Sequence, residues 1–295
     1  MKSFVLGLAF LFVAAVFCQA ADSSVPPSSS EPSQMLDFNL AGYGAKGQKT
    51  WEVQGASMDM QGNDVKINDI TAHLYGEKEQ MTLTADHGQF DKETGIIYLR
   101  DNVRAVTDSG MKMATDSLDW SQKDQVVKTQ DKVNVERDNM TATGQGVEAK
   151  PDLKIAKFEK DVVLTLEEQR KADEIKKADE GFSFGKGKMI ITCDGPMELN
   201  YEKNYAVFEK NVKVTSEQDQ GTMTSDKMTV IFSPETRRID RIEAAGHVVI
   251  ARGENTSTSE GAVFTAADKR VVLTGRPQLV LFPQEDKQED KNVSP

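Results

Sequence analysis

The stretch AVFEKNVKVTSEQDQGTMTSDKMTVIF, residues 206–232, consists of two runs of alternating apolar residues joined by a polar turn that closes with Gly221. Its main apolar residues are Phe208, Val212, Val214, Met223, Met228, Val230 and Phe232. Alternation over four to eight residues, with β-branched side chains inside and turn residues at the ends, is typical of half-buried strands. The stretch therefore predicts two strands, each with one apolar face.

Similar segments recur along the chain. They lie at residues 100–120, 131–149, 160–166, 246–264 and 275–282. The matched valines are Val103, Val133, Val162, Val212 and Val248, at spacings of 30, 29, 50 and 36. The spacing of 50 includes a charged block of 21 residues, 167–187, without which it would be 29. A period of about 20–50 residues indicates stacked units that bury their apolar faces on one another, so we predict an all-β chain.

The composition excludes two classes of protein. The 47 acidic and 36 basic residues give a net charge of −11, which disfavours nucleic-acid binding because that function needs a basic surface. Two cysteines, Cys18 and Cys193, are too few for a disulfide scaffold. A hydrophobic content of 38% in 295 residues is enough for a folded core. Stability must therefore come from burial and strand pairing.

Residues 1–21 predict an export signal, because Lys2 precedes an unbroken apolar run at residues 4–17. This run is shorter than the roughly 20 residues of a membrane span. We predict cleavage after Ala20 or Ala21, with retention as an N-terminal anchor as the alternative. In either case the body of the protein lies outside the cytoplasm. Residues 22–34 are rich in Ser and Pro and predict an extended spacer.

A charged segment at residues 167–180, EEQRKADEIKKADE, interrupts the strand pattern. It has ten charged residues in fourteen, pairs such as Glu167 with Lys171 at helical spacing, and Ile175 as its one sizeable apolar residue. We predict a short solvated helix, which could act as a hinge between two halves. Residues 181–188 predict a flexible join, and the charged residues 284–295 predict a disordered tail.

Catalytic and metal-binding patterns find little support in the sequence. His73, His87 and His247 are far apart, and no metal-ligand spacing, nucleophile elbow or phosphate loop occurs. We therefore predict neither an enzyme nor a cofactor or metal site. Cys193 lies in a strand-like run and is interpreted as a small buried residue. Polar residues that precede the valines are interpreted as turn residues and not as calcium ligands; they are Asp101, Asn102, Asp131, Asp161 and Asn211.

Methionine is frequent at the expected inward positions. These residues are Met111, Met113, Met140, Met189, Met197, Met223 and Met228. Flexible thioethers suit a surface that repacks around variable guests, although an ordinary core is the alternative for most of them.

Two sets of motifs resemble a known pair of families. NDITAHLYG (68–76), TADHGQFD (84–91), IIYLRDNV (96–103), GMKMATDSLDW (110–120) and GQGVEA (144–149) resemble LptC, the membrane-proximal subunit of the lipopolysaccharide export bridge. ITCDGPMELNYEKNYAVFEKNVKV (191–214), GTMTSDKMTVIF (221–232), RIEAAGHVVIA (241–251) and VLTGRPQLV (272–280) resemble LptA, the OstA-type bridge domain. The resemblance covers about residues 35–282, and the chain looks like an LptC–LptA fusion.

The resemblance implies two consecutive OstA-like twisted antiparallel β-jellyrolls, or β-tacos, whose open apolar groove holds the acyl chains of lipid A. They would occupy residues 35–166 and 189–283, with the charged insertion at 167–188 between them. The implied function is a periplasmic carrier of lipopolysaccharide between the inner and outer membranes. The implied partners are the inner-membrane lipopolysaccharide ABC transporter and an LptD-like outer-membrane translocon, reached by edge-strand pairing, together with head-to-tail self-association. LptC relatives usually keep an N-terminal membrane helix, and the insertion has no counterpart in them.

Alternation along the strands predicts which residues line the groove. They are Val103, Met111, Met113, Val133, Val135, Val162, Val212, Val214, Met223, Met228, Val230, Val248 and Ile250. Because Met223 and Met228 differ in parity, both can face inward only if a β-bulge lies between them. Two other functions compete with lipid carriage. A structural or adhesive β-solenoid would have a closed core, and a glycan-active β-helix enzyme would need carboxylates clustered on one sheet face.

Overall fold

A computed structural model describes residues 33–282, except 45–46, 77–78, 122, 125, 151–154, 168–186, 218–220, 237 and 269. The described residues form seventeen strands and no helix. The strands are β1 (Ser33–Tyr43), β2 (Lys49–Gln61), β3 (Asp64–Tyr75), β4 (Gln80–Asp91), β5 (Ile96–Thr107), β6 (Lys112–Ser121), β7 (Val126–Arg137), β8 (Met140–Lys150), β9 (Ile155–Glu167), β10 (Lys188–Cys193), β11 (Met197–Asn200), β12 (Tyr205–Ser216), β13 (Gly221–Phe232), β14 (Ile239–Arg252), β15 (Asn255–Thr265), β16 (Arg270–Thr274) and β17 (Gln278–Val280). The predicted export signal and tail, and the spacer up to residue 32, lie outside the described residues.

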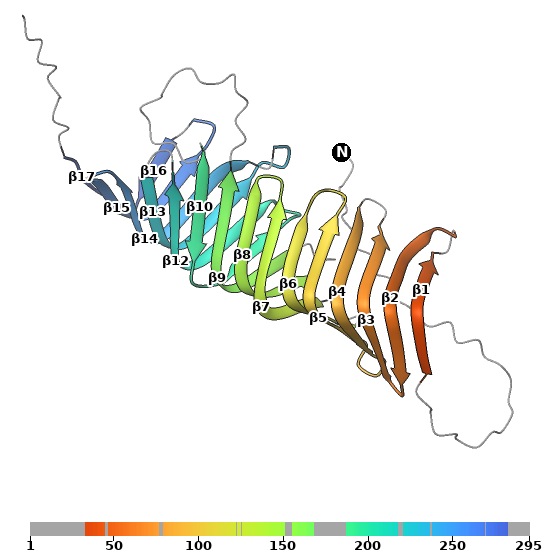
Figure 1. Ribbon diagram of the computed structural model, residues 1–295. Coiled ribbons are helices and arrows are strands. Elements are labelled where there is room, and N and C mark those ends of the chain that lie inside the picture. Colours follow the sequence, from red (N-terminus) through yellow and green to blue (C-terminus); the bar gives the residue numbers. More distant parts are fainter. Residues whose placement is uncertain are drawn as a thin grey trace, which may run out of the picture.

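The strands form one antiparallel sheet in which most strands pair with the next along the chain. β10 and β11 share one position between β9 and β12, and β16 and β17 share one position beside β15. Figure 1 shows an elongated body that runs from β1 at one end to β17 at the other. The all-β prediction is confirmed, and the stretch at 206–232 forms β12 and β13 as predicted.

Bulges near the middle of the strands bend this sheet into a trough. The halves of the strands on the two sides of the bulges form its two facing walls, which we call the arms. The ladder shifts register between Arg100 and Val103, between Glu209 and Val212, and between Ala245 and Val248. The positive-φ residues at mid-strand positions, which we call the keel, are Asp37, Asp69, Asp101, Asn102, Gly146, Asp161, Lys210, Asn211, Gly246 and His247. Asp, Asn and Gly tolerate this left-handed backbone better than other residues do.

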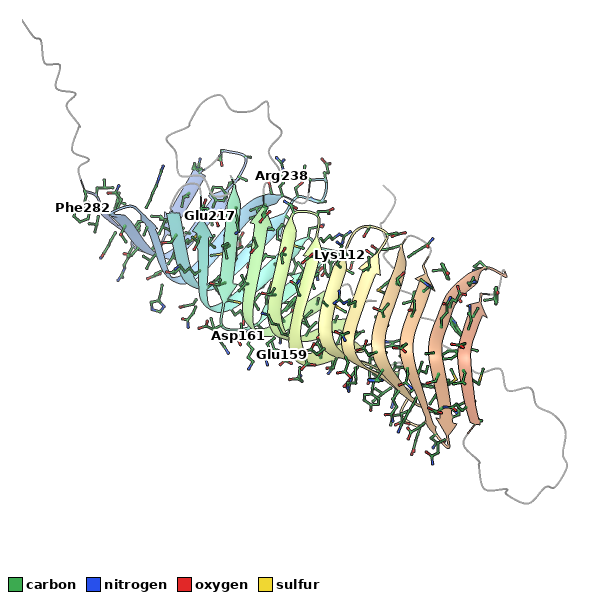
Figure 2. All side chains as sticks on the ribbon, viewed as in Figure 1. Lys112, Glu159, Asp161, Glu217, Arg238 and Phe282 are labelled. Carbon is green, nitrogen blue, oxygen red and sulfur yellow. The ribbon has the colours of Figure 1, made fainter. Side chains whose placement is uncertain are left out.

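The keel and the strand ends lie on opposite long edges of the body. Figure 2 shows Glu159 and Asp161 on the edge where the strands bend, and Lys112, Glu217 and Arg238 on the opposite edge. We call this second edge, where the hairpins turn, the rim. The interior of the trough therefore lies between the two arms and above the keel.

The interpretation of Asp101, Asn102, Asp131, Asp161 and Asn211 as turn residues between strands was wrong. All five lie inside strands, in β5, β7, β9 and β12. The same tolerance of left-handed backbone that favours turns also favours a bulge, so sequence alone does not distinguish the two. The matched valines each follow a bend and are almost fully buried; they are Val103, Val133, Val162, Val212 and Val248.

The charged insertion leaves and re-enters the sheet at neighbouring points. Lys188 at the start of β10 is the ladder partner of Glu167 at the end of β9. The predicted helix over 167–180 is not seen, because Glu167 belongs to β9 and residues 168–186 lie outside the described part of the chain. β9 and β10 are adjacent strands, so the sheet continues from one side of the insertion to the other.

Replacing Asp161 by valine tests the backbone of the keel. Asp161 is exposed and has φ of 54°, a conformation that a β-branched residue rarely adopts. We expect Asp161→Val to lower the free energy of unfolding by about 1–2 kcal/mol, because L-residues pay roughly this amount in left-handed backbone. Urea unfolding measures the change, with Asp161→Gly as the matched control that removes the same carboxylate without the strain. Equal losses in the two variants would contradict the prediction.

Glu52 fastens the edge strand β1 to β2 and β3. Its Oε1 accepts a hydrogen bond from Asn39 Nδ2 at 2.8 Å, and its Oε2 accepts bonds from Lys49 Nζ at 3.0 Å and Tyr75 Oη at 3.1 Å. The bond from Asn39 and then that from Lys49 hold the pKa of Glu52 at about 2, below its usual 4.5. The carboxylate is therefore stabilised in the folded state relative to the unfolded state.

This lowered pKa predicts an acid-dependent loss of the β1 attachment. A carboxyl whose folded pKa is depressed contributes stability above its unfolded pKa, and that contribution is lost as the pH falls from about 4.5 toward 2. We expect Glu52→Gln to flatten the fall in stability over this pH window and to speed hydrogen exchange in β1 at neutral pH. Urea unfolding at several pH values and exchange mass spectrometry measure the two effects. An unchanged pH profile of stability in Glu52→Gln would show that Glu52 does not cause a significant part of the loss of stability in acid.

Candidate functional site

The interior holds two clusters of buried apolar side chains. The N-terminal cluster consists of Phe38, Trp51, Val53, Met58, Val65, Ile70, Ala72, Leu74, Leu83, Ala85, Ile97, Leu99, Val103, Ala105, Leu118 and Trp120. The C-terminal cluster consists of Val133, Ala142, Phe158, Val162, Leu164, Met189, Ile191, Cys193, Met197, Ala206, Phe208, Val212, Val214, Met223, Met228, Val230, Ile242, Ala244, Val248, Ile250, Ala262 and Phe264. Met113 packs against both. The boundary between the clusters falls between β6 and β7 and not at the insertion.

The side chains of the two clusters differ in their exposure to solvent. Most large side chains of the N-terminal cluster keep 5–9% of their surface exposed, as Leu74 and Leu83 do. Most of those in the C-terminal cluster keep 2% or less, and Phe208 and Met228 keep none. The interior is therefore more open toward β1 and more tightly packed toward β15.

Twelve of the thirteen residues predicted to line a groove belong to these clusters or pack against them. Met113 and Val135 are partly buried against the clusters, and the other ten are cluster members. Met111 is the exception, since it is half-buried in the turn before β6 and its backbone N–H bonds to Thr107 Oγ1 at 3.2 Å. The structure thus brings most of the predicted residues into one interior, and their contact with a ligand stays a prediction.

Met223 and Met228 both face inward, as the bulge hypothesis required. The ladder between β13 and β14 shifts register between Thr224 and Lys227, which reverses the parity of the strand. Both thioethers are almost completely buried as a result.

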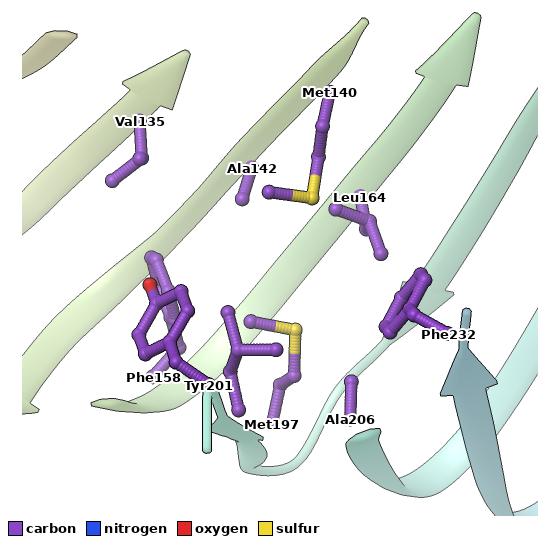
Figure 3. A pocket seen from close by; sticks show the side chains of 10 residues that line it. Val135, Met140, Ala142, Phe158, Leu164, Met197, Tyr201, Ala206 and Phe232 are labelled. Atoms are coloured by element: carbon purple, nitrogen blue, oxygen red, sulfur yellow. The ribbon is translucent and has the colours of Figure 1, made fainter. Parts of the chain in front are cut away.

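A pocket lies inside the C-terminal cluster, between the two arms of the trough. Its cavity volume is about 20 Å³, room for little more than one water molecule, so its walls must move apart before an acyl chain can enter. Its lining is Val135, Met140, Ala142, Phe158, Leu164, Met197, Leu199, Tyr201, Ala206 and Phe232. Figure 3 shows these side chains around one space, with Tyr201 as the main polar group. Only apolar guests with few polar atoms suit such a lining.

Sequence reasoning included Val135 in its list of groove residues but did not find the pocket. The lining residues come from β7 to β13 and meet only when the two arms face each other. The list of groove residues also left out the large aromatic side chains of the interior, although Phe208 had been placed in an apolar strand run. These side chains are Trp51, Trp120, Phe158, Phe208 and Phe264. These aromatic residues alternate with polar neighbours in the sequence, and this pattern could have placed them in the interior.

The polar groups of the described residues are dispersed. No group of three or more His, Cys, Asp or Glu could hold a metal ion there. His73, His87 and His247 bond to Thr82, Asn68 and Asp226 at separate places, and the bond to Asp226 raises the pKa of His247. Burial raises the pKa of the Cys193 thiol to about 11, so this thiol stays protonated at neutral pH.

A bent antiparallel sheet with an apolar interior between two arms places the protein in the β-jellyroll class of folds. The family described as "Lipopolysaccharide-assembly, LptC-related" matches residues 4–167, more than half of the chain. The chain belongs to this family. Residues 195–294 match a second family, "LptA/(LptD N-terminal domain) LPS transport protein", so the two occur in tandem as in an LptC–LptA fusion. None of the curated proteins compared with the chain matches it.

Both families are bridge proteins of lipopolysaccharide transport, which disfavours the scaffold alternative. Such bridges work in the periplasm. Within the described part of the chain, no helix has the length and apolar character to cross a bilayer.

Proposed function

We propose that this chain sheathes the acyl chains of lipid A in its interior while lipopolysaccharide crosses the periplasm. The observation that supports this function is the succession of two apolar clusters from β1 to β15, with Met113 in contact with both. Exposing acyl chains to water costs about 0.8 kcal/mol per CH₂, so a lipid with several chains would cost on the order of tens of kcal/mol to carry bare. A lined trough removes this cost without any covalent step.

The two ends of the sheet supply surfaces for neighbouring bridge components. β1 exposes Met35, Leu36, Leu40 and Tyr43, and the opposite end exposes Val272, Leu279, Val280, Leu281 and Phe282. Figure 2 places Phe282 at that C-terminal end. Unpaired edge strands with apolar side chains are templates for β-augmentation. We infer that these ends pair with the inner-membrane lipopolysaccharide ABC transporter, with an LptD-like translocon or with another copy of the chain.

Site-specific photo-crosslinking in cells that make lipopolysaccharide tests the proposed function. A photoreactive residue at Met228 or Val230, both fully buried in the interior, is expected to capture lipopolysaccharide. The matched control is Thr229, which lies between them on the opposite face of β13 and is half-buried. Mass spectrometry of the native purified protein should find lipid A. Equal capture at all three positions, or absence of lipid from the purified protein, would overturn the proposal.

The N-terminus decides how the bridge is attached. The family match begins at residue 4 and so includes the apolar run at 4–17. N-terminal sequencing of the protein from its native membrane fraction would distinguish a chain cut after Ala20 or Ala21 from one that keeps this segment as an anchor.

A further inference from the structure

The ladder between β6 and β7 has a long interruption. Ala114 pairs with Asn134 and Asp119 pairs with Lys128. Between these pairs, residues 115–118 of β6 and residues 129–133 of β7 are not ladder partners of one another. We call these two segments the seam. Interruptions within other pairs of unbroken strands leave at most three residues unpaired on each side. The sheet is therefore joined more weakly here than between its other full-length strands.

Side chains replace part of the missing ladder at the seam. Ser117 Oγ lies 3.2 Å from Thr129 Oγ1 and donates to Asp131 Oδ2 at 2.5 Å. In contrast, backbone bonds bridge the break between β10 and β11, where the N–H of Asp194 donates to the carbonyl of Lys210 at 3.1 Å. Hydroxyl contacts between side chains exchange with water more readily than a continuous ladder does.

A buried polar group marks the interior side of the seam. Thr115 is 6% exposed, and its Oγ1 has no hydrogen-bond partner among the described residues. Thr129, across the seam, is buried as well. An unpaired buried hydroxyl is unfavourable in the closed state and becomes satisfied when water or a ligand reaches it. The seam thus carries a local bias toward opening.

The seam also separates two parts of the interior with different packing. The more exposed N-terminal cluster ends at Trp120, and the tightly packed C-terminal cluster begins at Val133. The pocket starts directly beyond the seam, because Val135 of β7 and Ala142 of β8 line it. An acyl chain that moves from the open part to the closed part must pass this place.

We propose that the interior consists of two acyl-binding compartments, and that the β6–β7 seam is the gate between them. Separation of β6 from β7 admits acyl chains from the N-terminal compartment to the C-terminal compartment, which contains the pocket. The gate lies within the LptC-related part of the chain and not at the junction of the two family matches. This inference rests on the proposed lipid carriage and adds to it a gated boundary within the interior.

A reversible disulfide across the seam tests the gate. Ser117→Cys with Thr129→Cys places two thiols where hydroxyls now lie 3.2 Å apart. Cys18→Ser removes one native cysteine, and Cys193 remains because its thiol is buried and protonated. Ser57→Cys with Asn68→Cys is the matched control, since these ladder partners touch at 2.7 Å across β2 and β3, inside one compartment. Photoreactive residues at Leu83 and Met228 report the two compartments.

Oxidation of the seam pair is expected to lower lipopolysaccharide capture at Met228 several-fold while capture at Leu83 persists. Reduction of the disulfide should restore capture at Met228. The control pair should change neither. Capture at Met228 that is insensitive to the seam disulfide would overturn the gate and indicate entry over the rim. Loss of capture at both positions in the reduced protein would instead refute lipid carriage itself.

A second cysteine pair and a hydrogen-exchange measurement test the gate if the first pair does not form a disulfide. Ala114→Cys with Asn134→Cys locks the same place through ladder partners. In the unmodified protein, amides of residues 115–118 and 129–133 should exchange with deuterium faster than those of residues 97–100, which are ladder-paired on both sides. Equal exchange rates would contradict a weak seam.

Discussion

Phe208→Ala is expected to lower the free energy of unfolding by about 3–5 kcal/mol, the range for truncating a buried aromatic residue. Phe208 is fully buried, and its ladder partners are Met197 on β11 and Met228 on β13. The ring therefore fills the interior where three strands meet. Its removal loses the transfer free energy of the ring and leaves a cavity that these strands cannot close without moving.

Urea unfolding of the full chain measures this loss. The matched control is Val207→Ala, because Val207 is the preceding residue on the opposite, half-buried face of β12. We expect it to cost about 1 kcal/mol or less, as substitutions on a solvated sheet face do. A similar loss for Val207→Ala and Phe208→Ala would show that the interior does not control stability at this strand.

Met223→Asp should destabilise the protein by roughly 3–5 kcal/mol or more, because an unpaired charge would be buried. Met223 is 1% exposed and its ladder partners are Val214 and Ile250, so no cation among them can pair with a carboxylate. Burial raises the pKa of such a carboxyl above its unfolded value of about 3.9. The deficit should therefore be smallest at acid pH and grow as the pH rises above about 4.

The neighbouring substitution Thr224→Asp is the matched control, because it introduces the same carboxylate on the other face of β13. Thr224 is half-buried on the other face of β13, and its ladder partner on β12 is Lys213. A carboxylate there meets an opposite charge, so its stability should change by less than about 1 kcal/mol. Unfolding of both variants at pH 4 and pH 7 compares them. A Met223→Asp deficit that does not grow with pH would argue against a buried carboxylate.

Sequence alternation predicted the strands and most of the interior because burial on one sheet face repeats every second residue. It placed Val212 and Val214 on the inner face of the strand that became β12, and both are fully buried. It did not distinguish a turn from a bulge at Asn211, since Asn suits the left-handed backbone of either. Whether the strand continues past such a residue depends on pairing with its neighbours, which lie elsewhere in the sequence.

Local patterns in the sequence were enough to predict that the chain is all-β, that its units repeat at about thirty residues, and that valine marks the same place in each unit. These properties are local, because they follow from side-chain parity and backbone preference. The folded structure was needed to show that the insertion joins adjacent strands, that the apolar clusters divide between β6 and β7, and that residues from β7 to β13 form one pocket. These depend on which strands pair and how the two arms face each other, and such contacts form between residues distant in sequence.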